Sequence, residues 1–570
     1  MRGILVGDAG TLEHAQLTEF ASESWYESTI LSTDEFSAVH VHHGERAPAS
    51  HQAVETGSIR YLRHGIIRQC SYDSEKELAT ELLDSPESVL PKLDGSFLLC
   101  VFDDDDLVIA TDRLASKRLY TSTDPFIASS SLAALARHQT DPEIDPKTVG
   151  DLLTFGYAWN DNSLIKSVDT MPIASYIEAS NQVPRRYSSY VSRESNGSQS
   201  FVDNVALEYR NAVQSCTDSV EAGDHMGMWL SGGLDSRFAA KELSRSRKNI
   251  RTFTYDGNPA DGTNVEPAKR IAAKLNIDHE ICEFTPNGTA EYLDKAALLT
   301  DGMKTWRYIH GVDYIFNDLS DNVDVMLDIS GQGEVFGDDI FSETLQQSNK
   351  ADLVDSLYHD LAAFDANKIL KTPYSGRQTT AKAIDNAVGN TVYETGSDVI
   401  YANYFRNHYR GDLVGSQVDT RSPLTSRALL ERTAALPPKL RQHYFPMTGG
   451  KIPQPVAPLK LKLARRTDSL SDIKYERTNL QPKWPQPIQL LGAAYVKLRH
   501  DRYGTKANWY RSNTTLRRTV DDRLANMTEL DFINKHAVAQ LQDEVLSGDD
   551  DALHPIAVLS SIGSWHQQVM

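Results

Sequence analysis

Residues 226–237 combine side chains and a spacing that suit a phosphate site. The sequence there, MGMWLSGGLDSR, is an apolar run that breaks into a loop with two adjacent glycines and continues in a helical pattern. This pattern predicts a strand, a tight loop and a helix, which turn backbone N–H groups and the positive helix end toward one point. The adjacent glycines let an anion approach without interference from a Cβ atom. The expected cofactor-binding residues of this loop are Leu230, Ser231, Gly232, Gly233, Asp235 and Ser236.

Asp235 narrows the choice of ligand. Its charge would repel bare phosphate, but it makes sense if Mg²⁺ accompanies a nucleotide, so the loop predicts ATP with Mg²⁺. The loop lacks the Gly-Lys-Ser/Thr ending of a Walker loop, and it resembles instead the pyrophosphate loop of enzymes that split ATP into AMP and pyrophosphate. The alternative is an ordinary turn, in which Gly, Ser and Asp serve as turn and N-cap residues.

The elements around this loop predict a parallel sheet. Residues 201–220 have helical spacing, and after the loop come an expected strand at 250–255, a helix at 266–275 and a short strand at 280–284. Strands that alternate with helices imply an α/β, doubly wound sheet. Ligands of such sheets lie at the carboxyl ends of the strands, where the loop and Tyr255 are expected.

The chain before residue 190 has mostly β patterns. We expect strands at 3–6, 38–41, 65–69, 97–102 and 107–111. Four aspartates at 103–106 separate two apolar runs and predict a hairpin turn rather than a Ca²⁺ site. A metal site at His40, His42, His43 and His51 lacks an accompanying acidic or cysteine pattern.

Three blocks of this region resemble the glutaminase domain of asparagine synthetases. They are Leu93-Asp-Gly-Ser-Phe97, the stretch from Asp112 to Tyr120 and the stretch from Phe126 to Leu135, in the family's order. The resemblance implies an N-terminal-nucleophile (Ntn-hydrolase-like) fold, an αββα sandwich. We therefore expect a glutaminase-like domain at 1–190, a Ser-rich linker at 191–200, and an ATP-pyrophosphatase domain with many helices at 201–570.

The catalytic part of this domain departs from the family. A cysteine nucleophile follows the initiator methionine in the family, whereas this chain has Arg2. A guanidinium group stays protonated and cannot form a thioester. Thr56-Gly57-Ser58 also replaces the family's glutamine-binding Asn-Gly-Glu. We expect a degenerate domain that does not hydrolyse glutamine.

A second glycine-rich motif, SGQGEVFGDD at 330–339, resembles the family's S-G-E-G-A-D-E-L-F-G-G-Y with two residues fewer. The resemblance implies that Ser330 and Gly331 contact the adenine and ribose. It also implies an acidic residue that shares Mg²⁺ with Asp235. Glu334 is the first choice for this metal and catalytic role, followed by Asp338 and Asp339. The alternative is a glycine-rich loop without a ligand.

Other family positions leave alternatives open. Arg421, in a block similar to V-x-x-R-x-P, is expected either to contact the nucleotide or to form a structural ion pair. Asp301 and the stretch from Trp306 to His310 belong either to an amino-acid pocket or to the core. Asn479 falls at the family's catalytic lysine in a loose alignment, so Lys474 and Lys483 are the candidates for that role.

Composition excludes several other classes of protein. The 570 residues carry a net charge of −20 without a long basic block, which disfavours binding to nucleic acid. Cys70, Cys100, Cys216 and Cys282 form no CxxC pair, so neither a zinc site nor a disulfide framework is supported. No apolar segment approaches the ~18 residues of a membrane span, and we expect a cytoplasmic protein.

Together, the resemblance implies an ATP-dependent, AMP-forming amide ligase. The carboxylate of a small molecule, aspartate or an analogue, would be adenylated and then attacked by ammonia or an amine. One alternative is an amide ligase for another substrate, as in the β-lactam synthetases or an enzyme that modifies a sugar or metabolite. Another is a nucleotide-binding pseudoenzyme. Family members often pair, so a homodimer is an expectation that no stretch of this sequence demonstrates.

Overall fold

The computed structural model describes residues 2–10, 12, 23–190, 199–246, 248–255, 264–338, 340–405, 411–445, 448, 451–499 and 505–570. Most of the expected linker at 191–200 and the candidate Asp339 lie outside the described residues. In the described part of the chain, no helix combines the length and the apolar character that crossing a bilayer requires.

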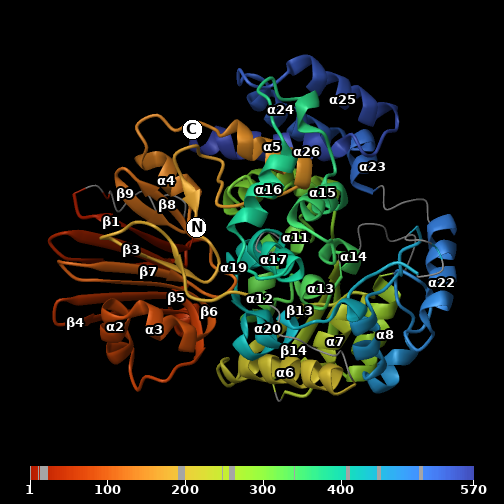
Figure 1. Ribbon diagram of the computed structural model, residues 1–570, viewed down its shortest axis with the longest axis horizontal. Helices are drawn as coiled ribbons and strands as arrows, with labels where there is room; N and C mark the ends of the chain where they lie inside the picture. Colours follow the sequence, from red (N-terminus) through yellow and green to blue (C-terminus); the bar gives the residue numbers. More distant parts are fainter. Residues whose placement is uncertain are drawn as a thin grey trace.

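The N-terminal part is built on two six-stranded antiparallel sheets (Figure 1). The first has the order β10 (Asp169–Thr170), β8 (Tyr120–Thr123), β9 (Phe126–Ser129), β1 (Gly3–Asp8), β3 (Phe36–His42) and β2 (Glu27–Ser32). The second has the order β12 (Arg185–Arg186), β11 (Ser175–Glu178), β7 (Leu107–Thr111), β6 (Asp94–Phe102), β5 (Ile59–Gln69) and β4 (His51–Thr56).

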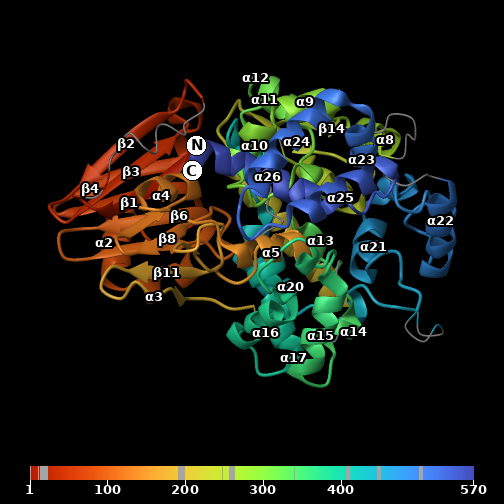
Figure 2. The same cartoon turned by 90° about the horizontal axis from the view of Figure 1, so that it is seen from above.

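Alternation along the strands makes this region a four-layered sandwich. On β6, Leu98, Cys100 and Phe102 face a core shared with β1, β3 and β9 of the first sheet. The intervening residues of β6 face the helices α2 (Glu75–Asp84) and α3 (Pro86–Val89) on the outer side. The outer side of the first sheet packs on α4 (Leu132–His138) and α5 (Pro146–Phe155). The expected αββα sandwich is therefore present, and Figure 2 shows it beside the helical body.

The predicted hairpin between two strands of the second sheet is confirmed. Residues 103–106 connect β6 to β7, which pair antiparallel. Asp103 Oδ1 accepts hydrogen bonds from the backbone N–H groups of Asp105 and Asp106, each at 2.9 Å. The carboxylate of Asp103 thus stabilises the turn itself.

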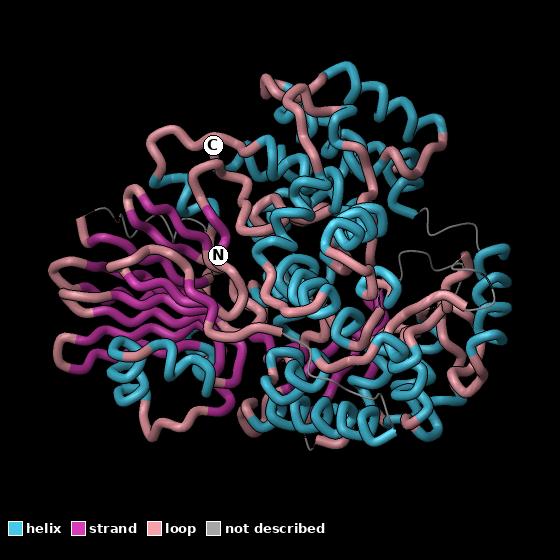
Figure 3. Tube along the Cα trace, in the orientation of Figure 1, coloured by secondary structure: helices cyan, strands magenta, loops and turns pink. Residues whose placement is uncertain are grey.

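The second part contains a parallel five-stranded sheet enclosed by helices (Figure 3). Its order is β15 (Asp278–Cys282), β14 (Asn249–Tyr255), β13 (His225–Trp229), β16 (Val325–Leu327) and β17 (Asp419–Arg421). One face packs on α6 (Gln199–Asp218), α7 (Leu234–Leu243) and α8 (Val265–Leu275). The other packs on α11 (Val312–Asn317), α12 (Leu319–Asn322) and α19 (Gly411–Gly415). The expected doubly wound sheet is confirmed.

The strand order determines where this sheet can bind a ligand. From β13 the chain adds β14 and β15 on one side, and it later adds β16 and β17 on the other. A crevice forms at such a switch point, outside the carboxyl ends of the two central strands. These ends are followed by the two glycine-rich motifs, at Ser231 and Ser330.

Helices from the rest of the chain surround both parts. The long helix α26 (Leu553–Val569) is buried on nearly all sides and belongs to one apolar cluster with α4, α5 and strands of the first sheet. Around it lie α9 (Pro286–Glu291), α10 (Leu293–Leu299), α23 (Thr505–Ser512), α24 (Thr514–Thr528) and α25 (Lys535–Ser547). The remaining longer helices are α15 (Lys350–Leu361), α16 (Gly376–Asn386), α17 (Val392–Val399), α20 (Arg427–Ala434) and α22 (Gln486–Arg499).

Candidate functional site

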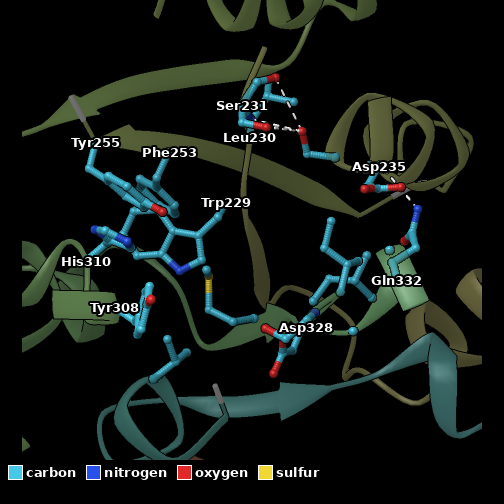
Figure 4. Close-up of a pocket in the computed structure, with 18 of the residues that line it drawn as sticks. Trp229, Leu230, Ser231, Asp235, Phe253, Tyr255, Tyr308, His310, Asp328 and Gln332 are labelled. Atoms are coloured by element: carbon cyan, nitrogen blue, oxygen red, sulfur yellow. Dashed lines mark hydrogen bonds between the residues drawn. The ribbon is translucent and has the colours of Figure 1, made fainter. Parts of the chain in front are cut away.

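A cavity of about 350 Å³ opens at the switch point of the parallel sheet. Its walls come from the carboxyl ends of β13, β14 and β16, from the short helix α13 (Gln332–Val335), and from α21 (Pro458–Arg465). Figure 4 shows Ser231 and Asp235 on one wall, Tyr255 and His310 on a second, and Asp328 on a third. The cavity therefore lies at the two strand ends that the glycine-rich motifs follow.

The first motif forms a loop that is held by its own side chains. Ser231 donates its backbone N–H to Ser236 Oγ at 3.0 Å, and Gly233 donates to Ser231 Oγ at 3.1 Å. The N–H of Gly232 is bonded to Asn264 Oδ1 at 2.9 Å. The helix α7 begins directly after the loop, and no side chain caps its first turn. Its partial positive charge is therefore available to an anion.

Arg237 anchors this loop from below. Its buried guanidinium donates to the carbonyl oxygens of Gly232, Ile473 and Lys474 at 2.8–3.1 Å. Burial lowers the pKa of Arg237 to about 10, so it still carries its charge at neutral pH. The loop and residues 473–474, far apart in the sequence, are thereby fixed to one another.

A buried lysine connects the two motifs across the cavity. Lys460 Nζ, from α21, lies 2.6 Å from Asp235 Oδ2 and 2.6 Å from Asp338 Oδ2. Arg477 Nη1 lies 3.8 Å from the same Asp338 oxygen. Burial opposes the charge of Lys460, but the two carboxylates outweigh it and hold the pKa of this lysine above its usual range. We refer to Asp235, Asp338 and Lys460 as the cavity centre.

Glu334 lies on α13 beside the cavity centre. Burial raises the pKa of its carboxyl group, and the nearby charges of Asp235 and Asp338 act in the same direction. A carboxyl group with a raised pKa can exchange a proton closer to neutral pH than an ordinary glutamate. It thus differs from Asp338, whose pKa Lys460 and Arg477 lower despite its burial.

The structure brings most of the expected site residues together. The cavity is lined by Leu230, Ser231, Asp235, Ser236, Tyr255, Ser330, Gly331 and Glu334. Gly232 and Gly233 belong to the same loop but do not line the cavity. The two candidate lysines lie elsewhere: Lys474 is exposed, and Lys483, about half exposed, pairs with Asp472 at 3.1 Å.

Sequence reasoning missed Lys460 and Arg477. Both line the cavity. Lys460 belongs to no motif that we could read, and Arg477 falls in the loosely aligned element of Asn479, for which only lysines are the sequence-based candidates. The burial of Lys460 shows only in the structure, where the other charged residues of α21 are not buried. A buried lysine normally requires a paired carboxylate, and the fold supplies Asp235 and Asp338.

The expected amino-acid pocket is divided between cavity and core. Tyr308 and His310 line the cavity, and the His310 ring stacks on Tyr255 with centroids 5.3 Å apart. Asp301 instead accepts hydrogen bonds from Tyr120 Oη at 2.8 Å and from the backbone N–H of Leu132 at 3.1 Å. Asp301 therefore holds the N-terminal sandwich to the second part of the chain.

A second charged cluster lies where the two parts of the chain meet. Asp419 on β17 pairs with Arg421 of the same strand, and its Oδ1 lies 3.8 Å from Arg2 Nη1. Burial would raise the pKa of Asp419, but Arg421, Arg2 and Lys117 hold it well below its usual range. We call Arg2, Asp419 and Arg421 the interface centre. It gives Arg421 the structural role that was one of its two alternatives.

The guanidinium group of Arg2 packs against the second part of the chain. A Cβ atom at Gly415 would lie only 2.5 Å from Arg2 Nη2, so the guanidinium packs directly on the backbone of α19. Beside it, His43 Nε2 lies 3.1 Å from the Gly415 carbonyl oxygen. The guanidinium thus extends from the start of β1 into the second part of the chain.

The histidines of the first sheet pack mainly against one another. His40 Nε2 lies 3.1 Å from His64 Nδ1, and the rings of His42 and His51 stack with centroids 3.8 Å apart. Within the described ranges, no group of three or more His, Cys, Asp or Glu side chains could hold a metal ion.

Comparisons with known proteins agree with this two-part architecture. Residues 208–444 match the asparagine synthase family, and residues 64–190 match the glutamine amidotransferase domain. The chain is 24% identical over 270 residues to the glutamine-hydrolysing asparagine synthetase 1 of Bacillus subtilis (strain 168). This alignment covers 46% of the chain and 43% of that protein, so the chain spans less than half the length of this relative.

Two solved structures are only distantly similar to the chain. One is an allosteric regulatory enzyme of purine biosynthesis, with 8% identity, a TM-score of 0.23, and coverage of 49% of this chain and 80% of that one. The other is a glutamine phosphoribosylpyrophosphate amidotransferase from B. subtilis in complex with ADP and GMP, with 11% identity, a TM-score of 0.24, and coverage of 63% and 79%. TM-scores this low do not establish a shared fold.

Proposed function

Because the chain belongs to the asparagine synthetase family and carries a glutamine amidotransferase domain, we propose that it is an ATP-dependent, AMP-forming amide ligase. The observation that supports this most directly is the cavity centre. There the uncapped start of α7, a buried ammonium group and both glycine-rich motifs surround one cavity. Such a combination of positive charge and backbone N–H groups suits the phosphates of a nucleotide.

In this proposal the nucleotide spans the carboxyl ends of β13, β14 and β16. Its base and ribose would contact Ser330, Gly331 and Tyr255, all of which line the cavity. Its phosphates would lie at Ser231–Ser236, close to Lys460 and Arg477. The internal hydrogen bonds of Ser231 and Gly233 would be exchanged for bonds to phosphate oxygens.

The residues present do not fit direct coordination of Mg²⁺ by Asp235. One oxygen of this carboxylate already lies against Lys460 Nζ, as does one oxygen of Asp338. Mg²⁺ therefore enters the proposal as the ion that ATP carries in solution. The expected metal pair of Asp235 and Glu334 is therefore left out of this proposal.

The reaction would proceed in two displacements. A substrate carboxylate oxygen attacks the α-phosphorus of ATP, the bond from that phosphorus to the bridging oxygen breaks, and pyrophosphate leaves. Lys460 and the start of α7 stabilise the negative charge that grows on the leaving group. An amine then attacks the acyl-adenylate, AMP leaves and an amide remains. Glu334 is the nearest candidate to accept the proton that the amine loses.

We assign the nitrogen to free ammonia or to a substrate amine rather than to glutamine. The support is Arg2, whose side chain is no nucleophile and instead pairs with Asp419. Aspartate is the simplest carboxylate, with an amino acid, sugar or other metabolite as the rival. We place this chemistry in the cytoplasm, where ATP is available and the four free cysteines would stay reduced.

Pyrophosphate release from Mg-ATP tests the proposal. Purified protein receives aspartate with ammonia, aspartate with glutamine, or a pool of other carboxylates with amines. Release with ammonia but not with glutamine supports an ammonia-dependent asparagine synthetase, and release only with the pool supports a ligase for another substrate. Bound ATP without release under any condition would contradict ligase activity and favour a nucleotide-binding pseudoenzyme.

A further inference from the structure

The cavity centre has the geometry of a bridged cation site. Asp235 comes from the first turn of α7 and Asp338 from the loop after α13, yet each places one oxygen 2.6 Å from Lys460 Nζ. Two carboxylates from separate loops that share one cation are typical ligands of a divalent ion. Here the shared cation is an amino acid side chain.

The charges around Lys460 leave little reason for a dication to bind. The side chains of Lys460 and Asp338 are each only 5% exposed, and Arg477 adds a second positive charge near Asp338. The carboxylates of Asp235 and Asp338 thus meet two cations, and burial raises the pKa of the neighbouring Glu334. A metal ion at the same place would displace the ammonium group and then lie beside it at unfavourable distance.

The positive charge of Lys460, unlike that of a metal ion, cannot dissociate from the site. Buried Leu459, Leu461 and Leu463 fix the helix α21, and the two carboxylates hold the ammonium group that it carries. Because the carboxylates keep its pKa above the usual range of a lysine, the group stays charged throughout the neutral range. Neither a chelator nor a moderate change of pH would remove it.

We propose that the ammonium group of Lys460 takes the place of a protein-bound divalent cation between Asp235 and Asp338. The protein by itself then binds no metal at the cavity centre, and replacing Lys460 opens a divalent-cation site there. This part of the inference concerns the free protein and does not depend on the reaction proposed above.

Titration with Mn²⁺, followed by electron paramagnetic resonance in the absence of nucleotide, tests the inference. We expect no Mn²⁺ at this site in the wild type and one ion in Lys460→Gln. Any wild-type affinity for Mn²⁺ at this site should be at least tenfold lower than that of the variant. Adding Asp338→Asn to Lys460→Gln should remove that ion. Lys462→Gln, on the same helix but outside the cavity lining, is the matched control and should behave as the wild type.

Two results would overturn the inference. One is equal Mn²⁺ affinity in the wild type and in folded Lys460→Gln. The other is a wild-type Mn²⁺ site that Asp338→Asn abolishes, which decides the matter even if Lys460→Gln fails to fold. Circular dichroism establishes whether each variant is folded.

A nucleotide measurement extends the inference and rests on the proposed function. If Lys460 supplies the positive charge, wild-type affinity for ATP should fall less than tenfold when EDTA replaces Mg²⁺. The affinity of Lys460→Gln should fall more than tenfold. A larger fall in the wild type than in the variant would count against the inference. If neither protein binds ATP, the proposed function fails, while the Mn²⁺ titration still decides the role of Lys460.

Discussion

The interface centre and the cavity centre both pair carboxylates with cations, but in different settings. At the interface, Asp419 is 2% exposed and is surrounded by Arg2, Arg421 and Lys117. In the cavity, the Asp235 side chain is 30% exposed and faces a space that a ligand can enter. Pairing alone therefore does not distinguish a structural ion pair from a binding site, because access to a cavity makes the difference.

The largest expected effect comes from breaking the interface centre. Arg421→Ala removes the closest of the cations that surround the buried Asp419 carboxylate. This loss should lower the free energy of unfolding by about 3–5 kcal/mol. Chemical denaturation measures this change. Arg427→Ala, which breaks the exposed pair of Arg427 with Glu431, is the control and should cost about 1 kcal/mol or less. Equal losses in both variants would remove the proposed difference between buried and exposed pairs.

Breaking the cavity centre should lower activity, and it should also cost stability because Asp338 stays buried without its closest cation. Lys460→Gln removes the charge that faces the leaving pyrophosphate, and we expect the rate of pyrophosphate release to fall by about 10²–10³-fold. Steady-state kinetics with Mg-ATP measures the rate, and Lys462→Gln is the control. A rate within threefold of the wild type would place the catalytic charge elsewhere, with Arg477 as the next candidate.

A third prediction concerns the pH dependence of the interface. Burial, with help from the charge of Arg2, lowers the pKa of His43 to about 3, whereas an unfolded histidine titrates near 6.5. Between these values the unfolded chain binds the extra proton, so the unfolding free energy should fall as the pH falls, by up to about 1.4 kcal/mol per unit for this histidine. Denaturation at pH 7, 6 and 5 measures the slope.

His43→Gln sharpens this test. The amide of glutamine keeps a donor for the Gly415 carbonyl oxygen but does not titrate. The variant should therefore lose less stability than the wild type on going from pH 7 to pH 5. An unchanged slope would assign the acid sensitivity to other groups, such as the buried His40 and His64, whose pKa values burial also lowers.

The smallest effect is expected at the two lysines that the sequence suggested. Lys483→Gln breaks an exposed pair with Asp472 and should change the unfolding free energy by less than about 1 kcal/mol. Lys474→Gln should be similarly mild, because the contact of this residue with Arg237 is made by its backbone carbonyl. Pyrophosphate release within twofold of the wild type is expected for both. A large loss in either would show that the lysine reaches the cavity during turnover.

Features that depend on neighbouring residues can be predicted from the sequence. The loop at Ser231–Ser236 is a local motif, since the glycines, the hydroxyl groups and the following helix lie within a dozen residues and their geometry follows from their order. The parallel sheet follows from the alternation of strands and helices, whereas the resemblance to the glutaminase domain implies the αββα sandwich. Predictions of this kind need no knowledge of contacts between distant segments.

The cavity centre could not be predicted in this way, because its members are more than a hundred residues apart. The sequence ranks Asp338 after Glu334 as the acidic candidate, and only the path of the chain after α13 shows that the Asp338 carboxylate lies against Lys460. The same holds for Arg2 and Asp419, which meet only after both parts of the chain have folded. Pairing between distant charges depends on tertiary packing that no local pattern encodes.

The burial of α26 has a consequence for the order in which the protein is made. One apolar cluster joins Leu5 and Val39 of the first sheet to Ile556, Trp565 and Val569 of this helix. During synthesis from the N-terminus, the sides of α4 and α5 that pack on α26 stay uncovered until residues 553–569 leave the ribosome. The packing around α4 and α5 is thus completed only when α26 has been made. A nascent chain that pauses before residue 553 would expose an apolar surface to chaperones.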